Sequence, residues 1–135
     1  MNYFVDTSFW CALYDAKDKN YQKARLLWKN AASYPLKLFI SDYIFDEIVT
    51  LVRRRLSHTH ALDLAESLLN SKVIIFLEVD KEVREKAWQI FKKYDDKDFS
   101  FTDCSSFALM QGCGIKKALA FDQHFEQMGF TVNEL

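Results

Sequence analysis

Short apolar segments rich in strand-forming residues alternate with amphipathic stretches, and this alternation limits the fold more than any other feature of the sequence. The segments predicted as strands are residues 2–5, 38–40, 73–77, 117–121 and 130–132. Strands that alternate with helices form parallel sheets covered by helices. We therefore expect an α/β fold with a central, mostly parallel sheet of about four to five strands and helices on both faces. Because residues 73–77 are continuously apolar, we expect them to form a central strand buried on both faces.

Apolar residues spaced three and four apart predict the helices between these strands. A first amphipathic helix covers residues 18–33 and is closed by Pro35. The others run from a Ser41 cap to about residue 56, over residues 61–69, onward from Asp80, and from a Ser100 cap to near Gly112 and Gly114, with a last helical turn over 123–128.

Composition narrows the class of protein. At 135 residues and 50% hydrophobic, the chain is expected to form one globular domain over residues 1–135. A net charge of −1 argues against nucleic-acid binding by a strongly basic surface. Three cysteines without C-x-x-C spacing indicate reduced thiols, so we expect a cytoplasmic protein. No apolar run approaches the roughly 18 residues of a membrane span, and no signal segment precedes the first strand, so no membrane partner is expected.

Four acidic residues occupy positions where catalytic acids are found. Asp6 and Asp122 directly follow predicted strands. If Ser100 is an N-cap, Asp103 is the third residue of its helix, where free backbone N–H groups favour an ionised carboxylate at neutral pH. Glu47 lies on the border of an apolar helical arc. The plainer interpretations are that Asp103 only caps its helix and that Glu47 is solvated surface.

These acids are expected to converge. In an open parallel sheet, ligands bind outside the carboxyl ends of the strands, and all four acids can reach that edge. Carboxylates at such close range repel one another unless a cation neutralises them, and all-oxygen ligands suit Mg²⁺ or Mn²⁺ rather than zinc. Such ions activate water and stabilise the leaving oxygen of a phosphodiester. The pattern therefore suggests hydrolysis of nucleic acid.

Four short motifs in this order resemble those of PIN-domain nucleases. They are Phe4-Val5-Asp6-Thr7-Ser8, Glu47 in its helix, Phe101-Thr102-Asp103, and Ala120-Phe121-Asp122-Gln123-His124-Phe125. The order, the spacing and the length of the chain are most similar to VapC-type ribonuclease toxins of prokaryotic toxin–antitoxin pairs. Each motif alone is common, but four in order across the whole chain make a specific joint signal.

The resemblance implies a set of roles. It implies that Asp6, Glu47, Asp103 and Asp122 are catalytic and bind Mg²⁺ or Mn²⁺. Thr7 or Ser8 would orient an acid or a water, and Asp98 is a candidate fifth acid. The resemblance further implies an RNA substrate, a homodimer and a small antitoxin as partner.

Basic residues offer candidate RNA contacts. Residues 53–55 are all arginine, and Arg54 lies two turns from Glu47 on nearly the same line of the helix. Lys116 and Lys117 form a second candidate patch, although runs of this kind are more often solvated faces.

Three rival functions follow from the same residues. A PIN-like module that binds RNA without cutting it would keep the four acids for stability or binding. A phosphatase of the aspartyl-phosphate type requires a second Asp two residues after the first, where this chain has Ser8. A Ser-His-Asp hydrolase is disfavoured because the chain has no G-x-S-x-G elbow.

Overall fold

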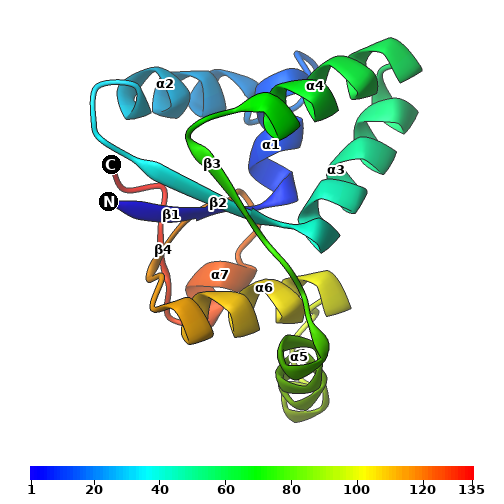
Figure 1. Ribbon diagram of the computed structural model, residues 1–135, viewed down its shortest axis with the longest axis vertical. Helices are drawn as coiled ribbons and strands as arrows, with labels where there is room; N and C mark the ends of the chain where they lie inside the picture. The colour runs from blue at the N-terminus through cyan, green and yellow to red at the C-terminus, as the bar shows by residue number, and fades with distance from the viewer.

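The computed structural model of the chain describes residues 1–135 and shows one five-stranded sheet between two groups of helices (Figure 1). The strands are β1 (Asn2–Val5), β2 (Lys37–Ser41), β3 (Ile74–Leu77), β4 (Lys117–Leu119) and β5 (Thr131–Val132). The helices are α1 (Thr7–Tyr14), α2 (Tyr21–Ala31), α3 (Asp42–Arg55), α4 (His58–Asn70), α5 (Lys81–Lys93), α6 (Phe101–Cys113) and α7 (His124–Gln127). Helices α1 to α4 lie on one side of the sheet and α5 to α7 on the other. The predicted α/β class is confirmed.

All neighbouring strands are parallel, in the order β3-β2-β1-β4-β5. The chain builds outward from β1 to β3 and then returns to place β4 on the opposite side of β1. The strand order therefore reverses between β1 and β4. In sheets of this kind the carboxyl ends at the reversal point form the ligand-binding crevice.

One strand prediction is wrong. Residues 73–77 were expected at the centre of the sheet, but β3 lies at its edge, and Ile75 and Phe76 are 37% and 39% exposed. The apolar run has another use here, because the ring of Phe76 packs edge-on against Phe45 of α3 at 5.7 Å between centroids. The central strand is β1, whose Tyr3, Phe4 and Val5 are fully buried. A smaller difference is that β4 ends at Leu119 rather than at residue 121.

Side-chain caps start the helices where the sequence predicts them. Ser41 accepts the backbone N–H of Ile44 at 3.0 Å to begin α3, and Asp80 caps α5 in the same way. Helix α6 is capped at its C-terminus by Gly114, whose positive φ of 67° suits the residue without a Cβ. None of the helices combines the length and the apolar character that crossing a bilayer demands.

Candidate active site

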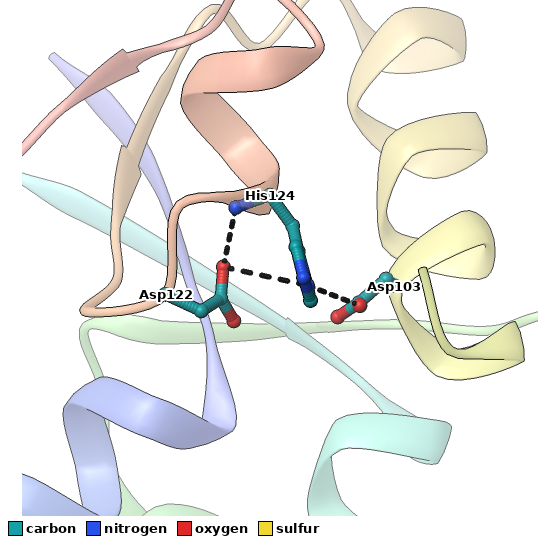
Figure 2. Close-up of side chains that lie close together, drawn as sticks. All are labelled: Asp103, Asp122 and His124. Carbon is teal, nitrogen blue, oxygen red and sulfur yellow. Dashed lines mark hydrogen bonds and ion pairs between the residues drawn. The ribbon is translucent and has the colours of Figure 1, made fainter. Parts of the chain in front are cut away.

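The four predicted acids meet in one cleft at the carboxyl ends of β1 and β4. Asp6, Glu47, Asp103 and Asp122 all line a hollow of about 580 Å³. They come from four separate parts of the chain, namely the end of β1, the middle of α3, the first turn of α6 and the loop after β4. Figure 2 shows how closely two of them approach, with the ring of His124 beside Asp103 and Asp122.

Asp6 is held by the start of the helix that it caps. Its Oδ2 accepts the backbone N–H of Ser8 at 3.1 Å and the Ser8 hydroxyl at 2.5 Å. The same hydroxyl oxygen accepts the backbone N–H of Phe121 at 2.9 Å. Ser8 therefore ties the β1–α1 junction to the loop that carries Asp122.

Asp103 combines a structural bond with a contact into the cleft. The predicted capping box is present, because Ser100 Oγ accepts the Asp103 N–H at 3.0 Å and Asp103 Oδ2 accepts the Ser100 N–H at 3.0 Å. Asp103 Oδ2 also lies 2.8 Å from His124 Nδ1. The backbone N–H of His124 in turn donates to Asp122 Oδ1 at 3.0 Å.

Each of the three aspartates uses one carboxylate oxygen for these bonds and leaves the other without a hydrogen-bond partner. Oδ2 of Asp6 and Asp103 and Oδ1 of Asp122 are engaged, whereas the second oxygen of each accepts nothing from the protein. A carboxylate that is fixed through one oxygen can offer the other to a cation. The arrangement suits an oxygen-coordinated metal ion.

Glu47 reaches the cleft from α3 and faces Thr7. The Thr7 hydroxyl is buried and has no hydrogen-bond partner at bonding geometry. Burial is the main cause that raises the pKa of Glu47, and the proximity of the Thr7 hydroxyl opposes that rise. A buried hydroxyl without a partner is uncommon, so Thr7 is available to a ligand or water in the cleft.

Burial and neighbouring acids disfavour negative charge on Asp6, Glu47 and Asp103. Burial raises the pKa of Asp6 well above its usual range, and the nearby Asp122 carboxylate raises it further. Burial also raises the pKa of Asp103, which outweighs the helix-cap bonds that lower it. Ionised together, these acids need a compensating cation, and the donor set of carboxylates and hydroxyls fits Mg²⁺ or Mn²⁺.

Some predicted residues lie elsewhere. Asp98 is exposed in the segment before α6 and does not line the cleft. Lys116 and Lys117 are at the start of β4, the end of the strand away from the acids. Arg54 lines an adjacent hollow of about 490 Å³ that shares Glu47 and Leu51 with the acidic cleft.

Three further residues of the cleft lining bear on its chemistry, and of these only Arg55, in the arginine run at 53–55, was a candidate from the sequence. His124 lies two residues after Asp122, within the last of the four motifs, and the sequence assigned it no role of its own. Arg55 lines the cleft and is held by Asp18 at 3.2 Å and Asp15 at 3.9 Å. Cys11 also lines the cleft, but burial raises its pKa to about 11, so it is a neutral thiol at neutral pH.

Comparison with known proteins agrees with this geometry. The PIN domain family matches residues 3–131. The chain is 39% identical over 128 residues to the 23S rRNA-specific endonuclease VapC20 of Mycobacterium tuberculosis, covering 95% of both chains. It is 27% identical over 123 residues to a VapC ribonuclease of Archaeoglobus fulgidus, covering 90% of this chain and 77% of that protein.

Solved structures give the same result. The crystal structure of Mycobacterium tuberculosis VapC20, described as a Sarcin-Ricin loop cleaving toxin, superposes with a TM-score of 0.88 at 37% identity over 97% of both chains. VapBC2 from Rickettsia felis, bound to a promoter DNA fragment, shares the fold with a TM-score of 0.68 at 11% identity over 98% of this chain and 97% of that one. On the match over residues 3–131 and the identity to VapC20, this chain belongs to the PIN domain family, among its VapC-type members.

Proposed function

We propose that this chain is a divalent-metal-dependent endoribonuclease and the toxin of a type II toxin–antitoxin pair. The observation that carries the proposal is the single cleft in which Asp6, Glu47, Asp103 and Asp122 meet. Mg²⁺ or Mn²⁺ bound by these carboxylates supplies Lewis-acid chemistry for phosphodiester hydrolysis. The names of the VapC relatives support the same activity.

The residues of the chain have distinct tasks in this proposal. Asp6, Asp103 and Asp122 present their unbonded oxygens to the metal, and Glu47 completes the set from α3. The Thr7 hydroxyl, which has no other partner in the protein, would donate to Glu47 or to a water molecule beside it and so orient that group. Without the metal, burial raises the pKa of Asp6 and Asp103, and ionised carboxylates in the cleft would also repel an RNA phosphate.

The substrate that we propose is 23S rRNA, because the 39% identical relative carries that specificity in its name. The proposed partners are a small antitoxin and a second copy of the chain. The antitoxin is supported by the likeness to VapBC2, which extends over nearly the whole chain. A cytoplasmic location remains a prediction from the cysteines.

Cleavage of ribosomal RNA tests the proposed function. Purified chain is incubated with intact ribosomes and with total RNA, in Mn²⁺, in Mg²⁺ and in EDTA. We expect discrete 23S fragments that require metal and that disappear in Asp103→Asn, a variant that keeps the size of the side chain and removes its charge. Mapping the new ends identifies the cut.

Either of two outcomes would contradict the enzyme. Binding of RNA by the folded chain without cleavage in either metal would favour the non-cutting module. Cleavage that persists in EDTA, or undiminished in Asp103→Asn, would remove the acidic cleft as the active site.

Two arginines are expected to bind RNA phosphates at the rim of the cleft. Arg55 lines the acidic cleft and Arg54 the hollow beside it. In a non-cleaving Asp103→Asn background, Arg55→Ala and Arg54→Ala should each weaken RNA binding more at low salt than at high salt, lowering the salt slope by about 0.7 to 1. Arg25→Ala, an exposed arginine on α2 outside both hollows, serves as the control. If the loss of RNA affinity does not vary with salt concentration, these arginines do not contact the RNA phosphates.

A further inference from the structure

We propose that His124 is a positioning residue that orients two of the metal-binding aspartates at once, Asp103 through its ring and Asp122 through its backbone. This inference rests on the proposed function, because it concerns how the same cleft holds its cation. His124 is not one of the four acids that the family resemblance implies. Its role follows from the contacts drawn in Figure 2.

The ring fixes which oxygen of Asp103 faces the cleft. His124 Nδ1 lies 2.8 Å from Asp103 Oδ2, the oxygen that also accepts the Ser100 N–H at 3.0 Å. An ionised carboxylate can only accept, so Nδ1 carries the proton in this contact. Both bonds load Oδ2 and leave Oδ1 as the ligand atom. Ser100 alone leaves the carboxylate free to pivot about one bond, and the ring supplies the second.

The backbone of the same residue fixes Asp122. The His124 N–H donates to Asp122 Oδ1 at 3.0 Å, which leaves Oδ2 unbonded. His124 Nδ1 is 3.9 Å from that same Oδ1, too far for a hydrogen bond. One residue therefore sets the spacing between two carboxylates that lie 19 residues apart in the sequence.

The ring is itself held in place. The Phe99 ring packs edge-on against it at 5.5 Å between centroids, and the side chain is only 20% exposed. The next residue, Phe125, is completely buried and anchors α7 in the core. The imidazole is thus pre-positioned before any cation arrives, as expected of a residue that supports metal ligands.

The alternative role for His124 is that of a metal ligand, and the experiment distinguishes the two roles. His124 could be a ligand through its second nitrogen, since Asp103, Asp122 and His124 offer atoms within 4.8 Å of one another. Asparagine places an amide nitrogen where Nδ1 stands, whereas glutamine places one where Nε2 stands. His124→Asn therefore keeps the hydrogen bond to Asp103. His124→Gln loses that bond and keeps a nitrogen only at the position of Nε2.

Binding of Mn²⁺ in the absence of RNA is the deciding measurement. Calorimetric titration compares wild type, His124→Asn, His124→Gln and the control His58→Asn, which changes an exposed histidine in the first turn of α4. We expect His124→Asn to stay within about threefold of wild type and His124→Gln to bind Mn²⁺ roughly 10- to 100-fold more weakly. Raising the Mn²⁺ concentration should restore cleavage by His124→Gln, while circular dichroism and melting in EDTA report its fold.

Each other result overturns the inference. If His124→Gln keeps its affinity for Mn²⁺ and His124→Asn loses it, His124 is a metal ligand through Nε2. Wild-type affinity in both variants leaves the ring without a role in the cleft. If both variants lose Mn²⁺ affinity equally, the ring of His124 acts by packing on Phe99 and not through Nδ1. If wild type itself neither binds Mn²⁺ nor cuts RNA, the proposed function fails and this inference fails with it, a result distinct from the other three.

Discussion

Replacement of Asp6 by asparagine is expected to lower RNA cleavage by at least about a hundredfold, since even partners of metal ligands contribute roughly 10- to 100-fold. Asn keeps the shape of the side chain and can still accept from Ser8, whose N–H and hydroxyl bind Asp6 Oδ2. What the variant loses is the negative charge at the buried end of β1. Cleavage should therefore fall while the fold persists.

The same substitution should make the metal-free protein more stable. The pKa of Asp6 is raised by burial and by Asp122, so the folded chain binds its proton more tightly than the unfolded chain does. Between the unfolded value of about 4 and the folded value, the unfolded state has lost a proton that the folded state keeps. Stability falls as pH rises through that window, and the loss remains at neutral pH. Asparagine does not ionise, so the variant avoids this loss of stability.

Melting in EDTA as a function of pH measures this difference. The gain in free energy of unfolding for Asp6→Asn over wild type should be near zero below about pH 4 and should grow toward neutral pH. Asp63→Asn, an exposed aspartate on α4 without an ion pair, serves as the matched control and should show no such growth. Saturating Mn²⁺ should reverse the order, because metal at about 100 times its Kd stabilises wild type by about 2.7 kcal/mol. If Asp6→Asn melts at a lower temperature than wild type in EDTA at neutral pH, the charge of Asp6 does not destabilise the metal-free fold.

Local patterns were enough to predict much of the fold and most of the cleft. The capping box of Ser100 and Asp103 spans four residues, so the sequence contains all of its parts. The strand β1 and the acid after it were also readable, because an apolar run that stops at Asp6 has few alternatives. Strand order at a reversal point then brings Asp6 and Asp122 together.

What the sequence could not predict depends on contacts between distant elements. The run at 73–77 is equally apolar in a central or an edge strand, and its place is set by strand order, in which β3 pairs with β2 alone and Phe76 packs on Phe45. His124 meets Asp103 across 21 residues, a contact between the starts of α7 and α6 that no local pattern contains. The pKa of Asp103 is raised although its helix cap alone would lower it, since burial arises from the whole fold.

Truncation of Phe107 is expected to have the largest effect on stability. Phe107 of α6 is fully buried, and its ring centroid lies 5.0 Å from those of Phe99 and Phe125 and 5.9 Å from that of Phe130. Phe107→Ala removes a large apolar side chain and leaves a cavity between α6, α7 and the segment before α6. The expected loss in the free energy of unfolding is about 3–5 kcal/mol. Urea unfolding measures it.

The matched control is Phe91→Ala on α5, whose side chain is 42% exposed and which should cost under about 1 kcal/mol. Equal losses in the two variants would contradict the assignment of the core.

A second effect follows for Phe107→Ala, because Phe99 packs on both Phe107 and the ring of His124. In the fraction that stays folded, weaker support for that ring should lower Mn²⁺ affinity, and Phe91→Ala should not. Core and cleft are then one mechanical unit, since the aromatic cluster that holds α7 against α6 also holds the histidine between Asp103 and Asp122.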